Sequence, residues 1–167
     1  MLSGYSEPSP IASYGPAVLR VGLALVFVAH GGQKLLGLWG GPGLEATAGF
    51  FAQMGLNPAY PLAVLVAVLE FGGGILLGLG AFTVPIAAAL TIEMLVAIWK
   101  VHLANGFFMN WNLVPVQGHG FEYNLVLIAG LVCLMLAGPG ALSIDGRRAS
   151  HARAAAAGRA RIRMGKV

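Results

Sequence analysis

A single acidic residue in the middle of an apolar run is the first position in this sequence at which chemistry is expected. The run extends from Pro61 to Gly80, about the 20 residues that a helix needs to span a bilayer, and Glu70 lies at its centre. A carboxylate at that depth is costly unless it faces protein or water. Gly74 and Gly78 follow at i+4 and i+8, and small residues let helices approach closely in lipid. We therefore expect Glu70 to point into packed helices that supply its partners.

Other ionisable residues lie in or beside further apolar runs. His30 and Lys34 are i, i+4 neighbours, and Glu93 and Lys100 are i, i+7 neighbours, so each pair shares a helix face. At 1.5 Å per residue, His30 and Glu70 lie at depths that differ by roughly one turn. The residues expected to exchange protons are Glu70 and His30, and those expected to bind a ligand or pair charges are Lys34, Glu93, Lys100, His102 and Glu122.

Two interpretations of these charges remain open. They line a polar pocket that opens at one membrane surface, as intramembrane ionisable groups often do, or they are ion pairs that only fix how the helices pack. The pairs would be Glu70 with Lys34 or His30, and Glu93 with Lys100 or a cation of a neighbouring helix. No His-x-x-x-His or Glu-x-x-His spacing is present, so no metal site is predicted. The single cysteine, Cys133, is expected to pack rather than to react, and His119 is expected to be a solvated loop residue.

The composition indicates a membrane protein. Hydrophobic residues make up 57% of the 167 residues and charged residues 10%, against about 25% charged in soluble domains, and the mean hydropathy is +0.80. Four apolar runs, at 17–36, 62–80, 84–100 and 123–138, account for the excess. Strand alternation is absent, so the runs are helices. The prediction is an all-α integral membrane protein whose domain, residues 16–146, is a four-transmembrane-helix antiparallel bundle.

The charge distribution predicts the orientation. Seven of the ten basic residues follow Asp145, and no acidic residue does. By the positive-inside rule this basic tail, 147–167, is cytoplasmic, so an even number of spans puts both termini there. The tail is expected to contact anionic lipid rather than nucleic acid. Residues 1–15 are expected to be a disordered lead, and Arg20 is expected to extend towards the near interface.

The two long connections are then expected to face outward. In the first, the stretch LEATAGFFAQM, residues 44–54, has helical spacing of its apolar residues and predicts a short helix on the membrane surface. The second connection, residues 101–121, is a loop rich in aromatic, asparagine and glycine residues.

Three ordered motifs resemble DoxX-type membrane proteins: LRVGLALVFVAHGGQKLLG at Leu19–Gly37, EFGGGILLGLG at Glu70–Gly80 and GPGALSIDG at Gly138–Gly146. The resemblance covers roughly residues 17–146 and implies a four-helix protein of the prokaryotic plasma (inner) membrane, described as a component of oxidoreductases. Relatives of this type are linked to thiosulfate:quinone oxidation and to thiol and superoxide defence. The motif residues carried over by position are Arg20, Gly31, Lys34, Glu70, Gly73, Gly74, Gly78, Gly140, Ser143 and Asp145.

The leading hypothesis is therefore a subunit of a membrane oxidoreductase in which the outer-half pocket binds a quinone. No cofactor motif is evident in the sequence, so electrons would come from a redox partner protein or a diffusible donor. The alternative is a non-enzymatic protein that binds or transports a small molecule, or an assembly subunit whose buried charges are structural. The glycine-rich second span serves internal packing or a homo-oligomer interface equally well. Whether the chain is catalytic stays open at this point.

Overall fold

The computed structural model describes residues 10–164, and every regular element in that range is helical. The expected lead, residues 1–15, lies mostly outside the described residues. Its last part is a 3₁₀ turn, Pro10–Ser13, which leads directly into the first helix. The α-helices are α1 (Tyr14–Leu36), α2 (Gly43–Gln53), α3 (Ala59–Val68), α4 (Gly74–Leu79), α5 (Thr83–Ala97), α6 (Glu122–Ala137) and α7 (Ile144–Met164).

Two π-helical turns interrupt the helices that carry acidic residues. The first, Leu69–Gly73, joins α3 to α4 without a break and contains Glu70. The second, Ile98–His102, extends α5 and contains Lys100 and His102. A π turn fits one more residue into a turn than the α-helix and often lies at a functional site. Face assignments that assume α-helical i, i+4 and i, i+7 spacing therefore do not hold across these two turns.

Three helical stretches are long and apolar enough to cross a membrane: Ile11–Leu36, Ala59–Leu79 and Thr83–Asn105. They correspond to the first three apolar runs of the sequence and extend them by a few residues. The fourth run forms α6, which is apolar but has only 16 residues. Large apolar side chains such as Val18, Leu65, Ile92 and Leu136 are exposed on the outer faces of these helices, as lipid contact requires.

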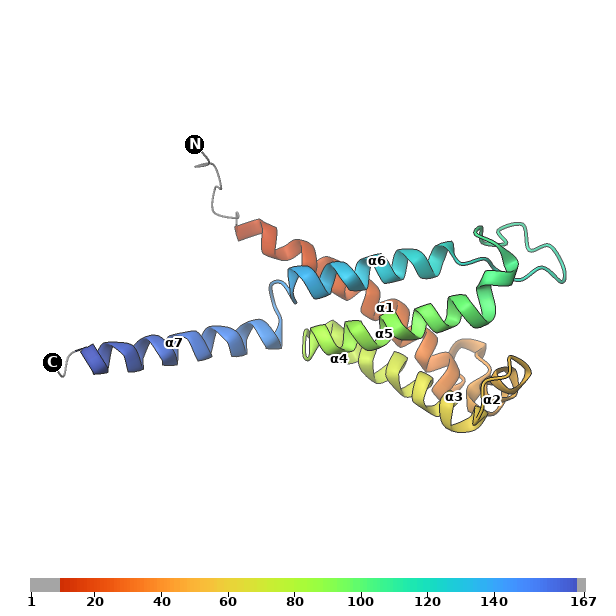
Figure 1. The fold of residues 1–167 in the computed structure, drawn as a ribbon, viewed down its shortest axis with the longest axis horizontal. Coiled ribbons are helices and arrows are strands. Elements are labelled where there is room, and N and C mark those ends of the chain that lie inside the picture. Colours follow the sequence, from red (N-terminus) through yellow and green to blue (C-terminus); the bar gives the residue numbers. More distant parts are fainter. Residues whose placement is uncertain (1–9, 165–167) are drawn as a thin grey trace.

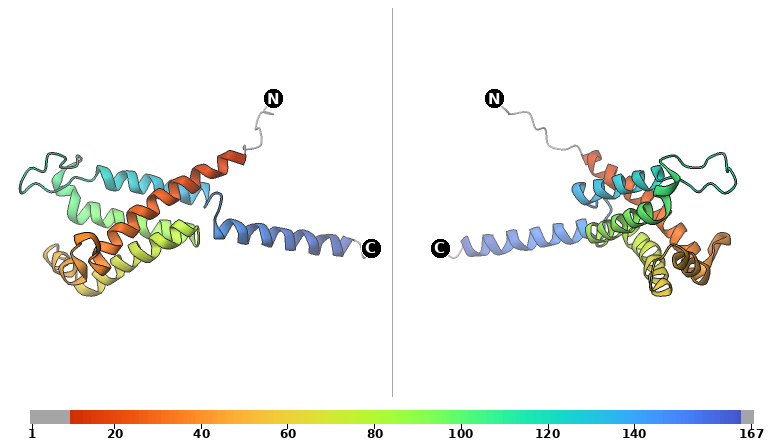
Figure 2. Two further views of the ribbon diagram at one scale, coloured as in Figure 1. Left: turned by 180° about the vertical axis from the view of Figure 1, so that it is seen from behind. Right: turned by 45° about the vertical axis from the view of Figure 1, so that its right-hand side comes forward.

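The helices pack as two layers that separate at one end. α1 lies along α3 and α4, α5 pairs with α6, and contacts of α1 with α6 and of α4 with α5 connect the layers (Figures 1 and 2). The long connections 37–58 and 103–121 both lie at what we call the loop end. The start of α1, the α4–α5 turn and the end of α6 lie at the opposite, terminal end. α7 projects away from the terminal end.

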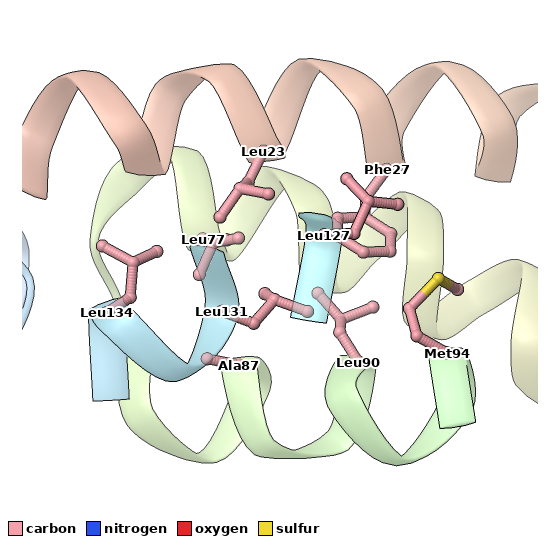
Figure 3. Packing of buried hydrophobic residues seen from close by; sticks show 9 residues of the cluster. All are labelled: Leu23, Phe27, Leu77, Ala87, Leu90, Met94, Leu127, Leu131 and Leu134. Atoms are coloured by element: carbon pink, nitrogen blue, oxygen red, sulfur yellow. The ribbon is translucent and has the colours of Figure 1, made fainter. Parts of the chain in front are cut away.

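Apolar side chains of α1, α4, α5 and α6, most of them leucines, fill the centre between the layers. Figure 3 shows this cluster, with Leu23 and Phe27 from α1 pointing towards side chains of α4, α5 and α6. The cluster comprises Leu23, Phe27, Leu77, Ala87, Leu90, Met94, Leu127, Leu131 and Leu134. All are less than a tenth exposed, so this core fixes how the two layers meet.

Glycines let α1 lie almost backbone to backbone against the segment that carries Glu70. A Cβ atom on Gly31 would fall against the main-chain atoms of Phe71, and one on Gly74 would lie 2.9 Å from the Val28 nitrogen. Gly78 faces Ala24 in the same way, one turn further along. The expected close packing on the glycine face is confirmed, although a π turn replaces the regular helix on which that expectation was based.

Arg20 does not extend to the interface, and that prediction is wrong. Its side chain is only 2% exposed and lies at the terminal end between α1, α4 and the 138–143 turn. The guanidinium donates to the carbonyl oxygens of Leu77 at 3.5 Å, Ala141 at 3.2 Å and Leu142 at 3.3 Å. The Leu77 carbonyl lies in the last turn of α4, and those of Ala141 and Leu142 lie in the turn between α6 and α7, so one rigid guanidinium with several donors ties these two segments to α1.

The Ser143–Asp145 segment joins the terminal end to α5. The Asp145 carboxylate accepts hydrogen bonds from the N–H groups of Phe82 (3.1 Å) and Thr83 (2.8 Å) at the start of α5. Its own N–H donates to the Gly80 carbonyl at 2.9 Å. Partial burial by itself raises the pKa of the Asp145 carboxyl, but these N–H donors and the nearby Arg148 outweigh it, so the pKa lies below its usual value.

Candidate functional site

A cavity of about 740 Å³ lies at the loop end, where the two layers separate. Its wall is mainly apolar and comes from α1, α2, α3, α5, α6 and the 103–121 connection. The ionisable residues on the wall are His30, Lys34, Glu70, Glu93, Lys100, His102, His119 and Tyr123. The apolar residues include Val26, Phe27, Phe50, Phe51, Leu56, Leu62, Val66, Met94, Val96, Ala97, Met109, Trp111 and Leu127.

The strongest polar interaction in the cavity wall joins α1 to the π turn. The Lys34 ammonium donates to both oxygens of Glu70, at 2.6 Å and 2.5 Å. Glu70 is 3% exposed and Lys34 is 25% exposed, so the carboxylate is enclosed while the ammonium reaches the cavity. Of the two partners that the sequence left open for Glu70, Lys34 and His30, the structure pairs it with Lys34, and the close approach at Gly31 brings the two side chains together.

Glu93 of α5 and Glu70 are neighbouring acids on the same cavity wall. The Glu93 Oε2 atom is buried and has no hydrogen-bond partner among the described residues. The sequence left Lys100 or a cation of a neighbouring helix as the partner of Glu93, and within the described range Glu93 forms no ion pair with either. Glu93 is therefore an acid whose hydrogen-bonding needs the surrounding protein does not fully meet.

Among the described residues, the other basic side chains of the cavity wall form no ion pair with an acid. Lys100 places its ammonium over the Trp99 ring, 4.3 Å from the ring centroid, instead of on an acid. The π turn accounts for this, because it breaks the α-helical spacing between α5 and Lys100. His102 Nδ1 is 2.9 Å from the His119 carbonyl oxygen, which ties the end of α5 to the following loop. His30 is exposed on the cavity wall, one turn before Lys34.

Glu122 is not on the cavity wall. Its Oε1 accepts hydrogen bonds from the Met109 N–H at 2.8 Å and from the Trp111 indole at 3.2 Å. Met109 and Trp111 are themselves wall residues, so Glu122 at the start of α6 holds the loop over the cavity. Glu122 was expected to bind a ligand or pair with a charge. In the structure it lies behind the wall residues Met109 and Trp111 and binds them instead.

Some residues of the cavity wall and of the loop beside it were not expected from the sequence. His119 was expected to be solvated. It is exposed and nevertheless lines the cavity, where its Nδ1 accepts the Asn110 N–H at 3.3 Å. Asn110 is 7% exposed and its side chain bonds Val114 and Gln117, so it organises the loop internally. The asparagine and glycine content of the loop was the only available signal.

The remaining motif residues lie elsewhere. Gly73, Gly74 and Gly78 line helix contacts, and Arg20, Ser143 and Asp145 hold the terminal end together. Cys133, expected to pack, has an exposed side chain on α6 instead. In the part of the chain that the structure describes, no group of three or more His, Cys, Asp or Glu side chains is arranged to hold a metal ion.

The arrangement suits a small amphipathic molecule. Apolar side chains dominate the wall, and the polar groups gather at the Lys34–Glu70–Glu93 side, with His30 nearby. Pockets for small molecules commonly combine an apolar wall with a few convergent polar groups, and the volume falls in the usual range. Exposed apolar helices around a buried charged cavity define the class of the chain: it is a multi-pass helical membrane protein.

The comparisons with known proteins agree with this class. The DoxX family model matches residues 15–103, and the chain belongs to the DoxX family. An uncharacterized membrane protein of Mycobacterium tuberculosis is 31% identical over 158 residues, covering 91% of this chain and 94% of the relative. The inner membrane protein YphA of Escherichia coli is 28% identical over 131 residues, covering 78% of this chain and 87% of the relative.

A third relative carries a functional name. The Bacillus subtilis protein named "Putative oxidoreductase CatD" is 28% identical over 131 residues, covering 78% of this chain and 84% of the relative. No solved structure matches this chain.

Proposed function

We propose that this chain is the membrane-embedded, quinone-binding component of an oxidoreductase. The observation that carries the proposal is the cavity itself. One cavity combines an extensive apolar wall with the Lys34–Glu70 pair, Glu93 and His30. A quinone has the matching chemistry, because its ring carbonyls need hydrogen-bond donors and its substituents need an apolar surface. The name of the Bacillus relative is in keeping with a redox role.

The proposal includes a topology. α1, α3 with α4, α5 and α6 form four antiparallel spans with both termini in the cytoplasm. The 16 residues of α6 measure roughly 24 Å at 1.5 Å per residue, shorter than the ~30 Å hydrocarbon core. Local thinning of the bilayer or the polar ends of neighbouring helices accommodate such a difference. The loop end and its cavity then face the outer half of the membrane, and the basic α7 faces the cytoplasm.

The proposed quinone site has a polar end and an apolar part. Lys34, Glu70 and His30 form the polar end that meets the quinone headgroup, while Phe50 and Phe51 of α2 cover the apolar part. Quinone reduction takes up electrons and protons together. The chain supplies titratable groups for the protons, and the electrons come from a partner protein or a diffusible donor. The partner is expected to bind at the loop end, next to the cavity.

Ligand-induced stabilisation tests the binding. The purified chain in mild detergent is titrated with a short-chain benzoquinone while its thermal unfolding is followed. We expect the midpoint to rise for the wild type and for Glu45→Gln, whose carboxylate is exposed on α2 outside the cavity. Glu70→Gln removes the acid that holds Lys34, and we expect it to reduce the rise. Native mass spectrometry of the same sample should show a retained quinone.

One observation favours the alternative assembly role. Lys34 and Glu70 already neutralise each other, as a purely structural ion pair would. If quinone gives no response in the wild type and Glu70→Gln only lowers stability, the pair is structural and the assembly role replaces the proposal. If a non-redox amphipathic molecule stabilises the protein and quinones do not, the chain is a small-molecule binding or transport protein.

A further inference from the structure

Three ionisable groups from three helical segments meet at the inner wall of the cavity. Lys34 of α1 donates to both oxygens of Glu70, and Glu93 of α5 lies against the same carboxyl group. One ammonium therefore faces two acids within a mainly apolar wall. The other titratable groups on the wall are His30, Lys100, His102, His119 and Tyr123. Within the described residues, none of them forms an ion pair with Glu93.

The contact between the two acids restricts their protonation. An ionised carboxylate only accepts hydrogen bonds, so a hydrogen bond between two carboxyl groups needs a proton on one of them. Two negative charges side by side in an apolar surrounding also repel strongly. Glu70 is the acid that keeps its charge, because Lys34 donates to both of its oxygens. The proton therefore belongs to Glu93.

The unpartnered oxygen of Glu93 points to the same assignment. Oε2 is buried without a hydrogen-bond partner in the described part of the chain. A buried acceptor left unpaired is costly, and a buried ionised one is far more so. A neutral carboxyl group avoids the charge, and its O–H becomes a donor. This O–H donates to Glu70 in the empty cavity, and it becomes available to a ligand when it turns away from Glu70.

We propose that Glu93 is a neutral carboxylic acid whose single O–H donates to Glu70 in the empty cavity and turns to a carbonyl oxygen of the ligand when one binds. The ligand class rests on the proposed function, whereas the protonation of Glu93 does not. Glu70 then also positions the Glu93 proton, while Lys34 keeps Glu70 charged. This refines the sequence-based expectation, in which Glu70 itself exchanged the proton.

Infrared spectroscopy of the full chain in detergent tests the protonation directly. A protonated carboxyl group has a carbonyl stretch that is separate from the carboxylate bands and shifts in D₂O. We expect this band at neutral pH in the wild type, in Glu93→Asp and in the matched control Glu45→Gln, and we expect it to be lost in Glu93→Gln. Glu70→Gln should keep the band at a shifted frequency, because an amide replaces the carboxylate partner.

Quinone binding tests the contact with the ligand. Adding a short-chain benzoquinone should shift the band in the wild type. Glu93→Gln keeps an N–H donor and should bind the quinone about as well as the wild type, whereas Glu93→Leu should bind it roughly fivefold to tenfold more weakly, the loss expected for one hydrogen bond.

The outcomes separate the two proposals. Absence of the band in the wild type, or its persistence in Glu93→Gln, overturns the neutral state of Glu93. A band that does not shift while the quinone binds overturns the contact with the ligand. A band that behaves as expected in a protein that binds no quinone supports the proton on Glu93 and removes the proposed function.

Discussion

Replacing Lys34 with methionine should show how strongly the cavity depends on its ion pair. The substitution keeps the apolar part of the side chain and leaves Glu70, 3% exposed, without its cation. Breaking a fully buried ion pair in this way costs roughly 3–5 kcal/mol. Lys34 is 25% exposed, so part of its charge is already solvated in the wild type. We therefore expect Lys34→Met to lower the free energy of unfolding by about 2–3 kcal/mol.

The complementary change should cost less. Glu70→Gln leaves an amide that still accepts a hydrogen bond from Lys34, whose ammonium can turn towards the cavity mouth, so we expect a loss of about 1 kcal/mol. In the double variant no unpaired carboxylate remains at position 70. Its loss should therefore be close to that of Glu70→Gln alone and well below the sum of the two single losses.

Unfolding by a denaturing detergent, monitored by circular dichroism, measures all four free energies of this double-mutant cycle. Glu45→Gln is the control, since that acid is exposed on α2 and makes no ion pair with any described residue. A coupling energy of at least about 1 kcal/mol is expected, whereas independent sites add to within roughly 0.3–0.5 kcal/mol. Additive losses would refute the inference that Lys34 stabilises an enclosed Glu70 carboxylate.

Three further changes test other parts of the fold. Arg20→Met removes the donor to three backbone carbonyls and should lower the free energy of unfolding by about 2–4 kcal/mol. The control Arg153→Met, on the exposed α7, should change it little. Equal effects of the two substitutions would contradict the assigned contacts. Asp145→Asn should destabilise the protein at neutral pH. The pKa of Asp145 is lower in the folded than in the unfolded protein, so its stabilising effect is fully present above the unfolded pKa of about 4 and is lost as the pH falls through the folded pKa. The unfolding curves of Asp145→Asn and the wild type should therefore converge in acid. A difference that widens in acid would refute this. Gly31→Ala forces a methyl group against the main chain of the π turn and should lower the free energy of unfolding by about 1–3 kcal/mol or more. Gly22→Ala, with open space around it, should leave the free energy of unfolding unchanged or raise it slightly. If Gly31→Ala is tolerated, α1 and the π turn lie further apart than the structure shows.

The sequence alone determined the class of protein and the main pair of the site. Long apolar runs form helices in lipid because every backbone group must be hydrogen-bonded within its own segment. An acid in the middle of such a run must be neutralised, so Lys34 was a foreseeable partner for Glu70. Gly31, Gly74 and Gly78 were also readable, because helices approach closely where side chains are smallest.

The tertiary structure decided what depends on local register and on distant segments. The π turns at Leu69–Gly73 and Ile98–His102 break the 3.6-residue period on which face assignments rest, so Lys100 lies over Trp99 and not beside Glu93. Arg20 is buried because carbonyls more than fifty residues away in the chain converge on it, which no local pattern encodes. The contact of Glu93 with Glu70 arises in the same way, since spacing within one helix does not specify which residue of another helix it will meet.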